Sequence, residues 1–274
     1  MLKRITALLI SAIIFTSSIQ ATTPTFNLKP VQLPILMYHF IVENRGDLHI
    51  CPTEFERDLR FLQENGYNTV GVTDLYEFVY AGVPLPPNPV MLTFDDGYYN
   101  NYHYAFPLLQ EYNAKAVIFV IGAHADIWSE NFYEDTHSGH LTWEQIREMS
   151  DSGLVEFGGH TYDMHKLRGR KGVARWEGEN LWEFQRVFGR DTQKFNDRFA
   201  EELGYTPTAF AFPFHEVCDD AANVLQILGY RALFTYRAKN TRNELIAGEP
   251  DCLLNLYRMN RSRLRSAQDI LSAE

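Results

Sequence analysis

Thr93-Phe94-Asp95-Asp96-Gly97 follows the apolar run Pro89-Val90-Met91-Leu92, and this junction decides how the rest of the chain is interpreted. Two adjacent carboxylates at the end of a buried strand are costly, because like charges held close together cannot both ionise without a compensating cation. A metal ion is the usual compensation, and it would leave one aspartate as a ligand and the other free to act as a base. An acidic turn is the simpler alternative, since Asp-Asp-Gly is also good turn chemistry.

A second polar stretch, Gly158 to His165, contains the ligands that such a metal would need. Its histidines, His160 and His165, are five residues apart and so do not share a helical face, where the spacing would be three or four. They suit a strand that ends in a loop, with both imidazoles folding toward one point. With Asp96 they make a two-histidine, one-carboxylate set with open positions, which is typical of a catalytic metal site. Taken alone, the pair could be surface histidines, because the chain contains 9 His.

Composition limits the class of protein. A chain of 274 residues with 45% hydrophobic content suits one large α/β domain with a sizeable core. The formal charge of −10 argues against nucleic acid as a partner, since no basic face could easily dominate. Cys51, Cys218 and Cys252 lack a Cys-x-x-Cys unit, so neither a zinc finger nor a redox motif is indicated. Buried thiols and one disulfide both remain open for them.

The N-terminus has the pattern of a signal peptide. Met1-Leu2-Lys3-Arg4 is a basic start, Ile5 to Ile19 is a short apolar region, and cleavage after Ala21 is plausible. A retained transmembrane anchor is the weaker interpretation, because the apolar stretch holds hydroxyl residues and has no stop-transfer flank. We therefore expect a signal peptide at 1–21, a linker at 22–32 and one domain at 33–274. The mature protein would be exported, with no stable membrane span.

Strand-like and helix-like segments alternate along the chain. Capping-box patterns at Thr53-x-x-Glu56 and Thr142-x-x-Gln145 predict the starts of two amphipathic helices. The predicted strands are Ile35 to His39, Thr69 to Val72, Val90 to Phe94, Ala116 to Ile121, Val155 to Phe157, Thr208 to Phe212 and Ala232 to Thr235. Such alternation predicts a parallel sheet, and seven or so units indicate a closed or nearly closed barrel.

The polar motifs fall at the ends of predicted strands. His39 ends the first strand, the Asp95-Asp96 pair ends another, His160 ends a later one, and Pro213-Phe214 follows another. In barrel enzymes the active site lies at the C-terminal ends of the strands. We therefore expect these motifs to form one catalytic site assembled from distant segments.

These motifs resemble those of a known family, the polysaccharide deacetylases (carbohydrate esterase family 4, the NodB-homology domain). The stretch from Thr93 to Gly97, the His160/His165 pair and Phe212-Pro213-Phe214 look like the family's first three motifs. The resemblance runs from about residue 33 to about residue 236, and it implies a distorted (β/α)7-type barrel.

One branch of the family is the better match. Pro34 to His39 (PILMYH) resembles the branch that deacetylates poly-β-1,6-N-acetyl-D-glucosamine, in which the catalytic-acid histidine lies near the N-terminus. The five-residue spacing between His160 and His165 also fits this branch better than the four-residue spacing common elsewhere. The resemblance therefore implies N-deacetylation of that polymer.

The resemblance also implies a role for each motif residue. These roles are general base for Asp95, general acid for His39, and ligands of a divalent metal, usually zinc, for Asp96, His160 and His165. Pro213 and Phe214 would border the reacting carbonyl, with the backbone N–H of Phe214 stabilising the oxyanion. The implied reaction is hydrolysis of an acetamide on an acetylated polysaccharide. Protein partners are not identifiable from the sequence.

The chain departs from the family at three places. Ala211 and Phe212 stand where much of the family has an arginine before the Pro-aromatic pair, so the orientation and pKa of Asp95 are left open. His215 occupies a position where this branch often has Gly, and its ring could pack, line the site or contact sugar. No fourth-motif sequence is identifiable, so the partner of His39 is unassigned, and His39 could also be an ordinary strand-end histidine.

Other functions remain open. An enzyme of the same family could act on peptidoglycan, chitin-like oligomers or acetylated xylan with shared chemistry. From another class, the chain could be a carbohydrate-binding protein that kept the fold and lost turnover. The complete Asp-Asp and His-His set speaks against the second alternative, because binding alone would not require both a metal and a free base.

Overall fold

The computed structural model describes residues 26–43, 46–236 and 242–272, so the predicted signal peptide at 1–21 lies outside the described residues. The strands are β1 (Val31–Leu33), β2 (Ile35–Tyr38), β3 (Phe40–Ile41), β4 (His49–Ile50), β5 (Asn68–Thr69), β6 (Pro89–Phe94), β7 (Ala116–Val120), β8 (Val155–Gly159), β9 (Ala209–Ala211), β10 (Ala232–Tyr236), β11 (Asn243–Leu245) and β12 (Leu256–Asn260). The α-helices are α1 (Pro52–Glu64), α2 (Val72–Ala81), α3 (Phe106–Glu111), α4 (Gly122–Glu130), α5 (Trp143–Asp151), α6 (Leu181–Leu203), α7 (Asp219–Ile227) and α8 (Ala267–Ser272). A π-helical segment (Asn101–Ala105) and two 3-10 turns (Pro213–His215 and Pro250–Leu253) complete the elements.

Seven parallel strands form a closed barrel in the order β2-β12-β10-β9-β8-β7-β6, and the pairing of β2 with β6 closes it. This confirms the predicted (β/α)7-type barrel, but one predicted member was wrong. The segment from Thr69 to Val72 supplies only β5, which pairs with the start of β6 outside the ring. Val72 already begins α2, and Gly71 is the N-cap of that helix. The remaining strand of the ring is β12, which the sequence pattern did not identify.

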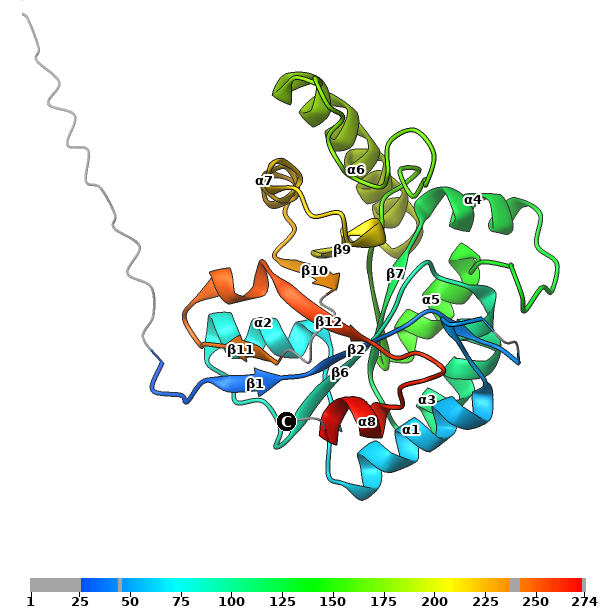
Figure 1. Cartoon of the computed structure of the whole chain (residues 1–274), viewed down its shortest axis with the longest axis vertical. Coiled ribbons are helices and arrows are strands. Elements are labelled where there is room, and N and C mark those ends of the chain that lie inside the picture. Colours follow the sequence, from blue (N-terminus) through cyan, green and yellow to red (C-terminus); the bar gives the residue numbers. More distant parts are fainter. Residues whose placement is uncertain (1–25, 44–45, 237–241, 273–274) are drawn as a thin grey trace, which may run out of the picture.

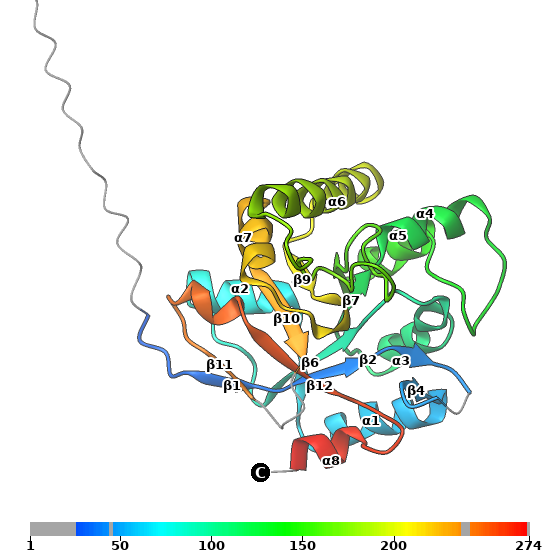
Figure 2. The same ribbon diagram turned by 45° about the horizontal axis from the view of Figure 1, so that its top comes forward.

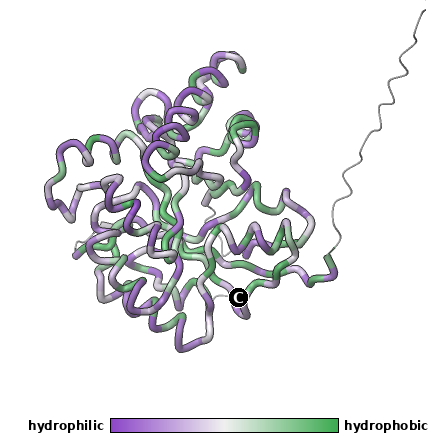
Figure 3. Tube along the Cα trace, turned by 180° about the vertical axis from the view of Figure 1, so that it is seen from behind, coloured by the Kyte–Doolittle hydropathy of each residue, from purple (hydrophilic) through white to green (hydrophobic). Residues whose placement is uncertain are grey.

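Side chains on the barrel strands alternate between its inside and its outside, because a strand repeats every two residues. Met91 and Phe119 belong to the interior cluster, whereas Leu92 and Ile118 pack outward against the helices. Figure 3 shows the hydrophobic residues concentrated in the central strands. Gly158 has to lack a side chain, because a Cβ there would lie 2.7 Å from the Phe119 ring inside the barrel.

The helices cover the barrel unevenly. Helices α1, α3 and α8 lie together on one side of the strands, α5 lies next to α4, and α6 and α7 lie beyond β9 and β10 (Figures 1 and 2). Helix α6 is the longest, with 23 residues, and runs from its N-cap at Asn180 to a left-handed Gly204. Its Phe184 and Phe188 pack with Phe210 of β9 in a separate apolar cluster. Helix α6 is therefore packed against β9 through this cluster.

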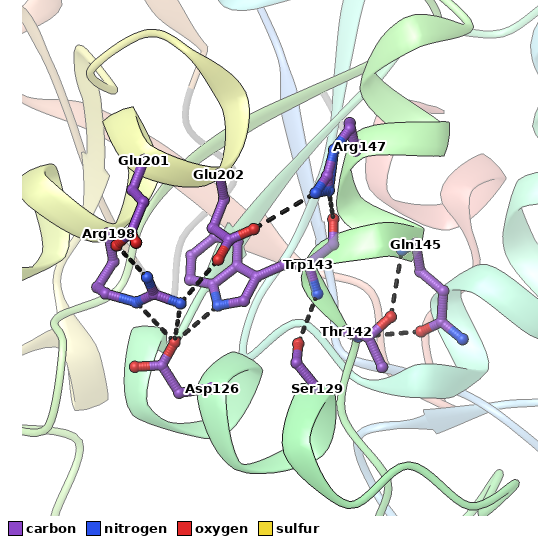
Figure 4. Close-up of polar contacts among 9 residues, drawn as sticks. All are labelled: Asp126, Ser129, Thr142, Trp143, Gln145, Arg147, Arg198, Glu201 and Glu202. Carbon is purple, nitrogen blue, oxygen red and sulfur yellow. Dashed lines mark hydrogen bonds and ion pairs between the residues drawn. The ribbon is translucent and has the colours of Figure 1, made fainter.

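A polar cluster joins α4, α5 and α6 (Figure 4). Asp126 on α4 accepts hydrogen bonds from the Trp143 indole at 2.7 Å and from Arg198 Nε at 2.9 Å. Arg198 Nη2 also donates to Glu202 on its own helix at 2.8 Å. Asp126 thereby joins α4 to both α5 and α6, so we regard the cluster as part of the structural scaffold.

The two predicted helix starts had different outcomes. The capping box at Thr142 is confirmed, since its hydroxyl accepts from the backbone N–H three residues on, and that residue's side chain accepts in return. The predicted start at Thr53 was wrong. The N-cap is Cys51, two residues earlier, so helix α1 begins at Pro52, and the Glu54 carboxylate accepts from the Cys51 N–H at 3.1 Å. Proline suits this first position because it has no N–H to satisfy there and its φ is already helical.

Three further observations concern the predicted organisation. Cys51, Cys218 and Cys252 are partly exposed and none is in a disulfide. Across the described ranges, no helix combines the length and apolarity needed to cross a bilayer. Strand β1 pairs antiparallel with β11, and within the described residues it is the first strand along the chain.

Candidate active site

The Asp95-Asp96 pair lies at the C-terminal end of β6, where the backbone turns sharply. Asp96 and Gly97 both have left-handed backbones, with φ of 70° and 67°, so the two adjacent carboxylates leave in different directions. Gly97 suits its place because a Cβ there would lie 2.7 Å from Val120 Cγ1. Asp95 points into the barrel toward Arg258, whereas Asp96 faces the histidine loop.

Arg258 of β12 binds Asp95 with both arms of its guanidinium. Nη1 bonds Oδ1, and Nη2 lies 2.8 Å from Oδ2, in the bidentate geometry that makes such pairs strong. Burial by itself would raise the pKa of Asp95, but the charge of Arg258 and the hydrogen bonds that it donates hold that pKa well below its ordinary value. Asp95 is therefore ionised at neutral pH.

Arg258 is the functional residue that the sequence reasoning missed. It is fully buried and supplies Asp95 with an arginine from another strand, whereas Ala211 offers none. Its guanidinium also lies 5.4 Å above the Phe119 ring inside the barrel. The available signal was an arginine in the middle of Leu256–Asn260, since a charge within a buried strand requires a partner.

Asp96, His160 and His165 converge on one point. Asp96 Oδ1 lies 3.5 Å from His160 Nε2 and 3.2 Å from His165 Nε2, and the three ligand atoms all lie within 4.8 Å of one another. His160 donates its Nδ1 proton to the carbonyl of Ala211 at 2.7 Å, which leaves the Nε2 lone pair facing Asp96. The histidine loop and β6 therefore present three possible ligands to the same point.

These three groups fit a divalent metal. Burial lowers the pKa of His160 to about 3 and also lowers that of His165, so both rings are neutral and offer lone pairs. Burial raises the pKa of Asp96 to about 6, although the charge of His39 opposes this shift. Within the described residues, Asp96 Oδ1 is buried without a hydrogen-bond donor. A buried carboxylate oxygen facing two imidazole lone pairs is the donor set of a metal site.

Tyr98 and His140 flank Asp96, and the sequence reasoning named neither of them. The His140 Nδ1 lies 3.2 Å from the carbonyl of Asp96, and the two rings of Tyr98 and His140 lie 4.9 Å apart. Burial lowers the pKa of His140 to about 3, so its ring is neutral as well. The two side chains fix the position of the backbone that carries Asp96.

His39 faces Asp95 from the neighbouring strand. Its Nε2 lies 3.9 Å from Asp95 Oδ2, and the side chain of Asn101 donates to the His39 carbonyl at 2.9 Å. Its Nδ1 is buried and has no hydrogen-bond partner within the part of the chain that the structure describes. The structure thus brings His39 to the carboxylates, and it assigns no side chain as the partner of Nδ1.

The turn Pro213–His215 lies on the other side of the histidine loop. The Phe214 ring lies 4.3 Å from the His165 ring. The turn is held by N–H groups of His215 and Glu216, which donate to the carbonyls of Phe212 and Pro213. The N–H of Phe214 donates none of the hydrogen bonds that hold this turn. All seven predicted site residues therefore lie at the C-terminal end of the barrel strands.

Backbone strain is concentrated at this end of the barrel. Among the described residues, six non-glycine residues have positive φ, and four of them belong to the site or adjoin it: Asp96, Thr161, Phe214 and His215. Each such residue costs on the order of 1–3 kcal/mol and persists only where the surrounding structure imposes it. The strain therefore marks the same end of the barrel that the ion pair and the possible ligands mark.

The family model described as "Polysaccharide deacetylase" matches residues 82–233, more than half of the chain. The protein belongs to the polysaccharide deacetylase family. The match includes Asp95, Asp96, His160, His165 and Phe214, whereas His39 and Arg258 lie outside the matched residues.

Individual relatives give the same family. A "Putative polysaccharide deacetylase YxkH" from Bacillus subtilis is 37% identical over 141 residues, which cover 52% of this chain and 46% of the relative. A "Poly-beta-1,6-N-acetyl-D-glucosamine N-deacetylase" from Escherichia coli K12 is 27% identical over 224 residues, covering 73% of this chain and 33% of the relative. This chain thus spans less than half the length of these two relatives. The structure of IcaB from Ammonifex degensii superposes with a TM-score of 0.72 at 27% identity, covering 88% of this chain and 96% of that one.

Proposed function

We propose that this protein is an exported, metal-dependent N-deacetylase that removes acetyl groups from N-acetylglucosamine units of poly-β-1,6-N-acetyl-D-glucosamine. The observation that carries the proposal is the pair of adjacent carboxylates with separate surroundings. Asp95 is held ionised by Arg258, whereas Asp96 lies among the imidazoles of His160 and His165. A protein that only bound sugar would need neither arrangement.

Each residue has a distinct task in the proposed reaction. Asp95 takes the proton from the water that attacks the acetamide carbonyl, and Arg258 keeps it ionised for this step. His39, across the site, gives a proton from Nε2 to the departing amine. The backbone N–H of Phe214 donates to the oxygen of the reacting carbonyl. A divalent metal held by Asp96, His160 and His165, which we propose to be zinc, supplies Lewis-acid polarisation of that carbonyl.

The substrate is the finer part of the proposal. The N-terminal position of His39 and the five-residue spacing of His160 and His165 support the β-1,6 polymer. The names of several relatives point to the same polymer. The pattern of residues 1–21 supports export, and we retain the division into 1–21, 22–32 and 33–274 as part of the proposal. Peptidoglycan and chitin oligomers, whose N-acetyl sugars are β-1,4-linked, are the alternative substrates.

A side-by-side assay tests the substrate. Metal-loaded protein is incubated with β-1,6- and β-1,4-linked N-acetylglucosamine oligomers of matched length, and acetate and free amines are measured. We expect acetate release from the β-1,6 series. Acetate from the β-1,4 series alone would change the proposed substrate to a β-1,4-linked polymer, while the proposed deacetylation reaction would still hold. Sugar binding without acetate release from either series would favour a carbohydrate-binding protein.

A further inference from the structure

His215 lies at the active-site end of the barrel, and the proposed reaction gives it no task. It follows Phe214 in the turn after β9, and its ring lies 4.4 Å from the ring of Tyr236, tilted by 34°. Tyr236 ends β10 and is paired in register with Arg258 of β12. The two rings therefore lie at the open end of the barrel, beside strand β12, which carries Arg258, the partner of Asp95.

The surroundings of His215 place it near the reacting groups. Burial is the main cause that lowers its pKa, to about 4, and the charge of Arg258 is the next. The charges of Asp95 and His39 also act on its ring. At neutral pH the ring is therefore uncharged, with one N–H donor and one acceptor nitrogen. Yet His215 as a whole remains exposed to solvent, so its ring is accessible to a ligand.

The backbone at His215 is strained. Its φ of 61° follows a φ of 54° at Phe214, so two consecutive non-glycine residues have left-handed backbones. A glycine would adopt this conformation at no steric cost. The turn is nevertheless fixed, because Val217 N–H donates to the His215 carbonyl at 3.0 Å and Lys171 binds Glu216 at 2.6 Å. These contacts hold the strained turn in place, and with it the imidazole of His215 beside the ring of Tyr236.

We propose that His215 and Tyr236 form a sugar-binding platform that holds the chain of the substrate beside the reacting N-acetylglucosamine unit. The inference rests on the proposed function and specifies which side of the site receives the polymer. An aromatic face covers the apolar face of a pyranose ring, and the neutral imidazole supplies a hydrogen bond to a hydroxyl group. His215 is then a specificity residue, with no part in the proton transfers.

The test uses His215→Gly, which removes the ring and suits the left-handed backbone, together with His215→Ala. Asn113→Gly is the matched control, because Asn113 also has positive φ, 48°, but lies between α3 and β7, away from the site. Metal content, the melting temperature, kcat and KM on a β-1,6 oligomer series, and hydrolysis of a small aryl acetate are measured on metal-loaded, full-length protein.

We expect both His215 variants to retain metal and aryl acetate hydrolysis, and His215→Gly to melt no lower than the wild type. On oligomers, KM should rise on the order of 3- to 10-fold, the size of one lost ring contact, with kcat within two-fold. Tyr236→Leu should raise KM similarly, and the double variant should add less than the sum, because the rings act together. Asn113→Gly should change no kinetic constant.

Two results would overturn the platform. One is an unchanged oligomer KM in both His215 variants, and the other is a loss of aryl acetate hydrolysis equal to the loss on oligomers, which would make His215 part of the reacting site. If the wild type releases no acetate from any oligomer, the proposed function fails separately. Calorimetric titration with the same oligomers then decides the platform, since equal Kd values for wild type and His215→Gly would exclude it.

Discussion

Two arginines three residues apart, Arg258 and Arg261, each hold a buried aspartate, and the comparison shows how one kind of ion pair serves two purposes. Arg258 faces the inside of the barrel and binds Asp95. Arg261, just beyond β12, faces α1 and binds Asp58 through Nε at 2.7 Å. The direction of the side chain thus decides which pair belongs to the site.

The surroundings of the two carboxylates differ as well. Asp58 also accepts from the Tyr38 hydroxyl and from the Ala267 N–H, both at 3.1 Å, so its oxygens are fully used in joining β2, α1 and α8. Asp95 has His39 and the open end of the barrel on its other side. Burial raises the pKa of Asp58 in spite of Arg261, whereas the pKa of Asp95 is lowered. A buried ion pair alone is therefore no sign of a catalytic site, because only a carboxylate with an unused side can accept a substrate proton.

The largest expected effect separates the two aspartates by activity. Asp95→Asn should lower kcat by about 10²–10⁴-fold, the usual cost of losing a general base, with the fold intact. Asp58→Asn should leave activity per folded molecule within a few-fold, and should lower the free energy of unfolding by about 3–5 kcal/mol, because Arg261 is left buried and unpaired. Acetate release and urea unfolding measure the two effects. A kcat loss of similar size in both variants would remove the distinction.

The arginines provide the next comparison. Arg258→Gln removes the charge that lowers the pKa of Asp95, so the acidic limb of the pH profile of kcat/KM should move to higher pH. Arg261→Gln should leave that limb in place and lower only the melting temperature. The profile is measured between pH 4 and 9 on metal-loaded protein. An unshifted acidic limb in Arg258→Gln would mean that Arg258 only supports the structure.

The smallest expected effect is on the pH dependence of folding stability. As the pH falls, the contributions of Asp95 and Asp58 to stability should change in opposite directions. The pKa of Asp95 is lowered in the folded protein, so the stability that it contributes is present above its unfolded pKa, near 3.8, and is lost as the pH falls further. The pKa of Asp58 is raised, so its contribution grows as the pH falls toward 3.8. The stability difference between wild type and Asp95→Asn should therefore shrink below pH 3.8. The difference between wild type and Asp58→Asn should grow as the pH approaches 3.8 from above. Urea midpoints between pH 2.5 and 6 check both signs, and slopes of the same sign would contradict the assignment.

Much of this arrangement was predictable from local sequence. The barrel followed from alternating segments, and the grouping of His39, Asp95 and His160 followed from their positions at strand ends. These predictions succeeded because a motif and its strand lie in the same short stretch, so tertiary contacts were not needed to find them.

The missed features depend on contacts that local pattern does not encode. Strand β12 contains an arginine and an asparagine, which interrupt its apolar pattern, and its Arg258 is paired with a residue 163 positions away. Likewise the segment Thr69 to Val72 has two valines, as a barrel strand would, but the chain turns into α2 at Val72 and only β5 pairs with β6. The left-handed backbone at His215 was not predicted, because positive φ is uncommon in any residue other than glycine.

The measurement that tests the central claim most directly compares the two adjacent carboxylates. Metal content and acetate release are determined on the same purified samples of wild type, Asp95→Asn and Asp96→Asn. We predict that Asp95→Asn keeps its metal and loses its rate, whereas Asp96→Asn loses metal first and activity with it. Full metal content in Asp96→Asn, or normal turnover by metal-loaded Asp95→Asn, would contradict the division of roles that the two carboxylates have here.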